Sequence, residues 1–186
     1  MNETLKTIMS RRSFRTYKPE QIKDEELQTI LEAGRYAPSG GGTQPWHFTV
    51  IQKSDVLQKI NVACREGMLK SGNKMFEERA KADNFSIFYH APMLIIVSGD
   101  EKTITPQEDC TLALGNMFLA AESIGIGSCW IHALGMLLNA EAGNALKKEL
   151  GIAEGYKVYG AGAFGYKPAE HPSPAPRKEG TVTIIK

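Results

Sequence analysis

The stretch RRSFRTY, residues 11–17, concentrates positive charge. Arg11, Arg12 and Arg15 fall within five residues, on a chain of 186 residues whose formal net charge is only +1. An arginine fork beside the hydroxyl of Ser13 suits a phosphate dianion, because several charge-assisted hydrogen bonds converge on one group. The other interpretation is a solvated helix end. The low net charge argues against a nucleic-acid partner, so we expect a small anionic target.

The stretch SGGGTQPWHF, residues 39–48, is rich in glycine. Neither Gly-Lys-Ser nor Gly-Lys-Thr follows the glycines, so this stretch is not a nucleotide-binding P-loop. Bare backbone amides and carbonyls could instead approach a flat polar ring closely. The alternative is a plain turn between a helix and a strand.

Two further patterns do not indicate a site. Gly160, Gly162 and Gly165 spell G-x-G-x-x-G, but prolines follow where a dinucleotide-binding fold would begin a helix. We expect these glycines to allow close packing of a strand. His132 follows Cys129 by three residues, yet no third group is visible to orient a thiol–imidazole pair. The three cysteines form no CxxC pair, which argues against a disulfide framework and a zinc site.

Apolar periodicity and capping residues predict the elements that position these groups. Helices are expected over residues 3–10, about 24–36, 54–65, 105–125 and 140–150. Strands are expected over residues 46–52, 92–99 and 156–166, with a short strand or loop over 128–134 and a strand-like end over 181–186. Asp24 and Asn139 are the expected caps of the second and the last helix. Residues 67–86 are polar and receive no assignment.

The helix over residues 105–125 has the clearest signal. Thr105 as the N-cap, Pro106 at the first position and Glu108 predict a capping box. From Leu112 to Ala121 the helix is apolar nearly all round. Such a helix must be buried, against the core or against a second subunit.

Length and composition predict one domain over residues 1–186, with a core of ordinary size. Charged residues make up 23% and apolar residues 42%, as is usual for a globular protein. No apolar run reaches the roughly 18 residues of a membrane span, and residues 1–10 lack a signal-peptide core. We therefore expect a cytoplasmic protein with no membrane partner and no nucleic-acid partner.

Taken in order, RRSFRTY, LEAGRYAPSGGGTQPWHF, HAPMLIIV, GIGSCWI and AFGYKPAEHPSPAPRK resemble the nitroreductase family of FMN-dependent oxidoreductases. The resemblance covers nearly the whole chain. It implies an α+β fold in which a mostly antiparallel sheet is flanked by helices, built as an intertwined homodimer with two FMN molecules in the interface. The C-terminal tail, about residues 167–186, would embrace the partner subunit and place residues 181–186 on its sheet.

The resemblance also implies roles for individual residues. Arg11, Arg12 and Ser13 match the phosphate and ribityl contacts, and Arg15 matches the basic residue near flavin N1 and the C2 carbonyl. Pro38, Ser39 and Gly40 match a loop lent by the second subunit. Trp130, Ile131 and His132 match the segment that faces flavin N5 and O4. Arg177 and Lys178 match a C-terminal phosphate clamp.

The chain departs from the family pattern at a few positions. Gly42 stands where many members carry Asn, so a side-chain contact to the flavin is missing. Asn84 matches an amide at the pyrimidine edge, but Ile87 falls where some members have a second basic residue. That leaves Arg15 as the main positive charge near N1. His132 stands where an acidic residue is common.

The activity that the resemblance implies is reduction of nitroaromatic or quinone acceptors with NADH or NADPH, by a ping-pong mechanism. The flavin carries the hydride, so we expect no catalytic side chain. An alternative is a dedicated reaction on the same fold, such as dehalogenation, flavin fragmentation or ring oxidation, with residues 67–86 as a lid. Another alternative is a non-catalytic flavin-binding protein.

Overall fold

The computed structural model describes residues 1–168 and 172–186, so a short part of the expected tail, residues 169–171, lies outside the described residues. The helices are α1 (Glu3–Ser10), α2 (Asp24–Arg35), α3 (Ser54–Leu69), α4 (Lys74–Lys81), α5 (Pro106–Ser123), α6 (His132–Asn139) and α7 (Asn144–Glu149), with 3₁₀ turns at Gly40–Gly42 and Glu141–Gly143. The strands are β1 (Trp46–Ile51), β2 (Met93–Asp100), β3 (Ile126–Trp130) and β4 (Tyr156–Tyr166).

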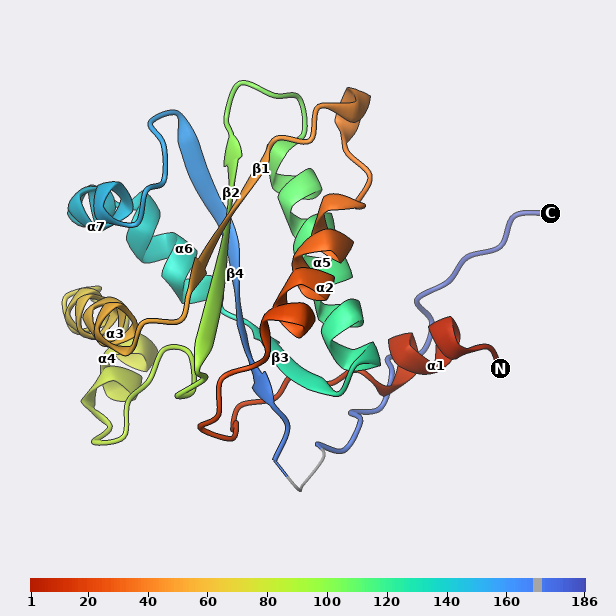
Figure 1. Cartoon of the computed structure of the whole chain (residues 1–186), viewed down its shortest axis with the longest axis horizontal. Coiled ribbons are helices and arrows are strands. Elements are labelled where there is room, and N and C mark those ends of the chain that lie inside the picture. The colour runs from red at the N-terminus through yellow and green to blue at the C-terminus, as the bar shows by residue number, and fades with distance from the viewer. Residues whose placement is uncertain (169–171) are drawn as a thin grey trace.

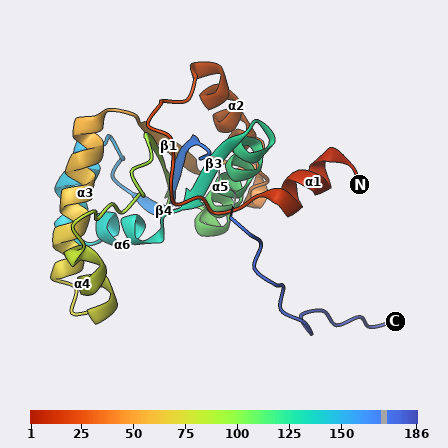
Figure 2. The same cartoon turned by 90° about the horizontal axis from the view of Figure 1, so that it is seen from below.

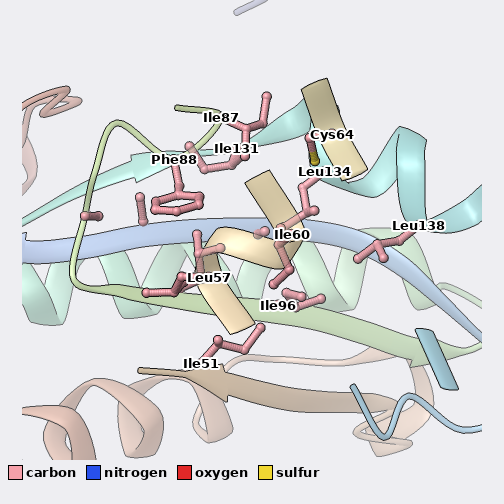
Figure 3. Packing of buried hydrophobic residues seen from close by; sticks show 14 of the residues in the cluster. Ile51, Leu57, Ile60, Cys64, Ile87, Phe88, Ile96, Ile131, Leu134 and Leu138 are labelled. Carbon is pink, nitrogen blue, oxygen red and sulfur yellow. The ribbon is translucent and has the colours of Figure 1, made fainter. Parts of the chain in front are cut away.

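The four strands form one antiparallel sheet in the order β1-β2-β4-β3. Helices α2 and α5 cover one face, and α3, α4, α6 and α7 lie on the other (Figure 1). Strand β2 is buried on both faces, which explains its continuous apolar run. Ile96 (Figure 3) and Leu94 contribute to the core under α3 and α6. Met93, Ile95 and Val97 contribute to the core under α2 and α5. The expected α+β fold is confirmed.

Helix α5 is buried on the side that faces the sheet and α2. Its buried side chains include Cys110, Ala113, Leu114, Met117, Phe118 and Ala121. Asn116 Nδ2 donates a 3.2 Å hydrogen bond to the carbonyl of Ala33, which fixes α2 against it. Leu112 is 48% exposed, so the outer face of α5 is only partly covered by this chain.

The glycines of strand β4 serve packing, as expected. A Cβ on Gly160 would lie 2.6 Å from Cη2 of Trp130, and a Cβ on Gly165 would lie 2.7 Å from Cδ of Pro92. Any side chain at these positions would displace its neighbour.

Thr105 is the N-cap residue of α5 and Pro106 its first residue, as expected, but the cap expected for α2 is wrong. Lys23, rather than Asp24, is the N-cap of α2, and its amide donates to Glu26. No side chain caps α5, because the Thr105 hydroxyl donates to the buried carboxylate of Asp109 and no capping box with Glu108 forms.

The helix expected over 140–150 is also different in the structure. Asn139 is the last residue of α6, and its side chain accepts a bond from the Val158 amide and donates one to the Val158 carbonyl. A 3₁₀ turn and the short helix α7 follow. Residues 128–134 divide between the end of β3 and the start of α6, and helix α4 lies within the unassigned segment 67–86. Residues 181–186 form no strand within this chain.

Candidate functional site

The arginine segment runs beside strand β3. Ser13 forms a parallel bridge with Ser128, and the Phe14 amide donates a 3.0 Å hydrogen bond to the Ser128 carbonyl. The Phe14 side chain is buried, which anchors the segment in the core. The segment is thus fixed between the end of α1 and the sheet.

The end of α1 is itself tied to the end of α5. The Ser10 hydroxyl donates to Oε1 of Glu122 at 3.1 Å, and Oε2 of Glu122 pairs with Nζ of Lys167 at 2.8 Å. Lys167 follows strand β4, so Glu122 connects α1, α5 and the beginning of the tail. The residues on either side of the arginine segment are therefore well held.

The arginines carry charge that the chain does not neutralise. Arg11, Arg12 and Arg15 form no ion pair with any carboxylate within residues 1–168 and 172–186. Arg12 donates from Nη1 to the carbonyls of Met9 and Arg11, at 2.7 and 2.8 Å, whereas its Nε is buried with no partner there. A buried N–H of a guanidinium without an acceptor is costly, so this position favours an anionic ligand.

Arg15 lies against the ring of Tyr89, with Cζ 5.8 Å from the ring centroid. A second arginine, Arg79 of α4, has its Cζ 5.4 Å from the same centroid. Tyr89 has a φ of 57° and His90 a φ of 56°, both in the left-handed region that L-residues rarely adopt. The His90 amide donates a 2.8 Å hydrogen bond to the Ser86 hydroxyl, which holds this strained turn.

Arg79 is a candidate site residue that the sequence analysis missed. It lies in the unassigned segment 67–86. The signal that could have found its helix is Asn73, whose side chain accepts hydrogen bonds from the amides of Met75 and Phe76 and so caps α4.

Asn84 lies at the exposed start of the segment that leads to Tyr89. Its carbonyl oxygen is 3.1 Å from Nε2 of His90. The buried Asn61, which the sequence did not single out, donates to the Phe85 carbonyl and accepts from the Ile87 amide, at 3.1 and 2.9 Å. Ile87 is buried in the core, so no charge stands at that position.

Trp130, Ile131 and His132 lie where β3 ends and α6 begins. The Ile131 amide donates to the Ala161 carbonyl at 2.8 Å, so it has its partner within the chain. His132 is exposed and is the first residue of α6. The amides of the first turn of a helix have no intrahelical acceptor and remain available to a ligand.

The neighbouring thiol of Cys129 is poorly placed to form a thiolate nucleophile. Burial raises the pKa of Cys129, and the nearby charges of Arg15 and Arg11 only partly oppose this shift. Burial likewise raises the pKa of Cys64 and of Cys110 to about 12. All three cysteines are free and buried.

The glycine-rich loop is shaped by Asp109 at the beginning of α5. The carboxylate of Asp109 accepts the Gly40 amide at 3.0 Å, and a Cβ on Gly40 would overlap Oγ1 of Thr105. Gly41 and Gly42 have φ values of 60° and 70°, and a Cβ on Gly42 would meet no atom within 4 Å. The backbone at Gly42 is therefore not covered by any side chain of this loop or by neighbouring atoms. The first residues of the loop, Pro38 and Ser39, are exposed and half-buried respectively.

One chain does not bring the loop and the arginines together. Asp109 holds the loop at one end of α5, and Glu122 holds the arginine segment at the other end (Figure 1). The two carboxylates are thirteen residues apart on α5, which is about 20 Å at 1.5 Å per residue. Arg177 and Lys178 are exposed in the tail, which runs away from the sheet in both views (Figures 1 and 2).

An apolar cavity of about 320 Å³ lies between α3, α4 and α6. Ile87 and Ala133, which line it, adjoin the segments that contain Asn84 and His132. The other lining residues include Cys64, Gly67, Met68, Phe76, Met136 and Leu137. The cavity therefore shares a wall with the candidate site.

Two kinds of site find no support in residues 1–168 and 172–186. No cluster of three or more His, Cys, Asp or Glu side chains there could hold a metal ion. In the same residues, no helix combines the length and hydropathy of a membrane span.

The fold is α+β, and the arginine segment beside its sheet is a candidate site for an anionic ligand. The family model described as the nitroreductase family matches residues 8–166, and the chain belongs to that family. The resemblance seen in the sequence is confirmed.

Solved structures and a curated relative agree with this assignment. A nitroreductase with bound FMN from Bacteroides fragilis NCTC 9343 is 42% identical, with a TM-score of 0.94 over 100% of both chains. A nitroreductase with bound FMN from Desulfitobacterium hafniense DCB-2 is 29% identical, with a TM-score of 0.90 over 100% of both chains. The NADPH-flavin oxidoreductase of Vibrio harveyi is 31% identical over 99% of this chain and 73% of its own length.

Proposed function

We propose that this protein is an FMN-dependent oxidoreductase that takes a hydride from NADH or NADPH and reduces nitroaromatic, quinone or related acceptors by a ping-pong mechanism. The observation that carries the proposal is the arginine segment beside β3, whose charge has no carboxylate partner in the described residues. The full-length likeness to two nitroreductases with bound FMN supports the same ligand.

The residues present fit an FMN phosphate. Arg11, Arg12 and Ser13 would hold the phosphate and the ribityl chain, and the buried Nε of Arg12 lacks the acceptor that a phosphate oxygen would provide. Arg177 and Lys178 of the tail would close over the same group.

The flavin ring of FMN would contact the backbone as much as it contacts side chains. Arg15 and Asn84 would face its pyrimidine edge, and the free amides at His132 would face N5 and O4, next to Trp130 and Ile131. Gly42 leaves open space, so it would contribute backbone only. When bound, FMN supplies the hydride chemistry, and the side chains bind and orient. No catalytic side chain is needed, and the raised pKa of Cys129 argues against a thiolate nucleophile.

The site is complete only in a homodimer. Pro38, Ser39 and Gly40 are about 20 Å along α5 from the arginine segment, so the loop that reaches one flavin must come from the second subunit. The exposed outer face of α5 is available for the contact. Val182, Ile184 and Ile185 of the tail are also exposed in the single chain and would be covered by the partner.

The test is the cofactor and the activity of the purified protein. We expect acid to release FMN, and a quinone to accelerate NADH or NADPH oxidation. Arg12→Gln is expected to lower FMN affinity by about tenfold or more, through loss of a charged hydrogen-bond donor. Arg35→Gln is the matched control, because Arg35 forms only an exposed pair with Glu32.

Two results would contradict the proposal. Recovery of FAD, or failure to bind any flavin after reconstitution, would exclude the FMN site. Bound FMN with no acceptor-dependent oxidation would instead favour the non-catalytic flavin-binding protein.

A further inference from the structure

Helix α4 presents Arg79 to the candidate site from an anchored position. Arg65 of α3 donates from Nε to the Ala80 carbonyl at 2.8 Å, and the Ala80 side chain is fully buried. Asn73 caps the other end of the helix. Figure 2 shows α4 packed at the end of α3, on the side of the sheet that carries α6. Both ends of α4 are therefore anchored, which fixes the backbone of Arg79 next to the buried Ala80.

The charge of Arg79 is not neutralised within the described residues. Lys81, two residues on, pairs with Glu78 at 2.7 Å. Arg79 itself forms no ion pair in residues 1–168 and 172–186, and it is exposed. Its guanidinium contacts the ring of Tyr89, which Arg15 also contacts. A guanidinium over an aromatic face keeps its N–H donors free for an anion.

The proposed contacts with FMN do not use the positive charge of Arg79. Arg11 and Arg12, with Arg177 and Lys178 of the tail, are assigned to the phosphate dianion, and Arg15 to the negative charge at the pyrimidine edge. Arg79 contacts the same tyrosine ring as Arg15, so it lies beside the residue assigned to the pyrimidine edge. In a nicotinamide donor, a ribose separates the phosphates from the reactive ring. Arg79, close to the proposed flavin edge, therefore suits an anionic substituent on a small acceptor better than it suits those phosphates.

We infer that Arg79 is an acceptor-recognition residue, which binds a carboxylate carried by a small aromatic acceptor. The inference rests on the proposed function and adds the substrate class to it: anionic nitroaromatics and carboxylated quinones are preferred over neutral ones of the same shape. A carboxylate and a guanidinium form paired hydrogen bonds, which an amide in the same place does not match.

The experiment compares para-nitrobenzoate with para-nitrobenzamide, which differ in charge but scarcely in size. The reduced holoenzyme is mixed anaerobically with each compound, and the return of the flavin absorbance gives the rate constant. Arg79→Gln is expected to lower the rate constant for nitrobenzoate about three- to tenfold and to leave that for nitrobenzamide unchanged. Arg79→Lys should recover part of the loss, and Lys81→Gln is the matched control on the same helix.

A second readout does not depend on turnover. Calorimetric titration of the oxidised holoprotein with benzoate should give a dissociation constant that is about three- to tenfold higher in Arg79→Gln than in the wild type. This difference should be smaller at high salt, because screening weakens the pair. Equal losses for both nitro compounds, no loss for either, or a change confined to the NADPH step would overturn the inference while the proposed function stands. A wild-type flavin that a quinone reoxidises but neither nitro compound does would overturn the inference alone, and one that no acceptor reoxidises would overturn both.

Discussion

Lys167 and Glu122 form an ion pair of 2.8 Å in which the side chains are only 18% and 7% exposed. The pair joins the residue after β4 to the last turn of α5, and Glu122 also accepts the Ser10 hydroxyl at the end of α1. The arginine segment begins at Arg11, the residue after Ser10. A charge pair outside the candidate site therefore fixes the segment on which that site depends.

Glu122→Gln is expected to destabilise the protein, because it leaves the half-buried Lys167 without a counter-charge. We expect the free energy of unfolding to fall by about 1–3 kcal/mol. Urea unfolding measures the change. Lys59→Gln is the control, because Lys59 and Glu149 form an exposed pair, whose loss should cost less than about 1 kcal/mol. Equal losses in the two variants would show that burial does not strengthen the Lys167–Glu122 pair.

Arg15→Gln is expected to lower the midpoint potential of bound FMN. A guanidinium near N1 favours the reduced, anionic flavin, with an effect of roughly 1–3 kcal/mol after allowance for solvent. Since ~1.4 kcal/mol corresponds to about 30 mV for a two-electron couple, the potential should fall by roughly 20–60 mV. The measurement is a spectroelectrochemical titration, with Arg35→Gln as control.

FMN binding should survive in Arg15→Gln, because the phosphate contacts are made elsewhere. An unchanged potential would show that Arg15 does not face N1, and loss of FMN would place Arg15 among the phosphate contacts.

The two-chain site predicts complementation between two defective variants. Arg12→Gln removes a phosphate contact, and Gly40→Ala displaces the loop because its Cβ would overlap the Thr105 hydroxyl. Each homodimer should bind FMN weakly. A co-expressed heterodimer has one intact site and one doubly defective site, so it should bind about one FMN per dimer.

Differently tagged subunits allow the heterodimer to be isolated and its flavin content measured. Flavin content no higher than in either homodimer would contradict a site shared between chains, as would a monomer by light scattering that binds FMN tightly.

The buried thiols predict a loss of stability at alkaline pH. Burial raises the pKa of Cys64 to about 12, above its value in the unfolded chain. The neutral Cys64 thiol therefore makes its full contribution to the free energy of unfolding below the pKa of the unfolded chain, near 8.5–9. This contribution declines as the pH rises toward the folded-state pKa of about 12. Between pH 9 and pH 10 the free energy of unfolding should fall by about 1 kcal/mol for this thiol.

The contribution of Cys64 is isolated by comparison with Cys64→Ala, because other titrating groups are common to both proteins. The variant is expected to be less stable at pH 8, but its stability should decline less steeply above pH 9. Parallel declines in the two proteins would show that the thiol does not titrate as its burial requires.

Those parts of the fold that depend on local signals were predictable. Strand β2 is a continuous apolar run because it is buried on both faces, and α5 begins with Pro106. The arginine segment was visible because three cations lie within five residues, although this pattern alone also suits a solvated helix end. The order of such segments along the chain indicated the family.

Other features depend on contacts that sequence patterns do not contain. Helix α6 begins one residue after β3, with no side-chain cap to mark its start. Asn139 has the chemistry of a cap, but its amide is used by Val158 of β4, a contact that only the tertiary structure creates. Arg79 is one cation among several in a polar segment, and only the position of Tyr89 distinguishes it.

The central claim is that this chain binds a flavin which NADH or NADPH reduces and a quinone reoxidises. The most direct measurement is an anaerobic titration of the purified protein with NADH, and in parallel NADPH, followed by addition of a quinone. We expect the yellow colour to bleach with about one equivalent of one of these donors per flavin and to return when the quinone is added. A flavin that neither nucleotide bleaches, or one that bleaches but is not reoxidised by the quinone, would contradict it.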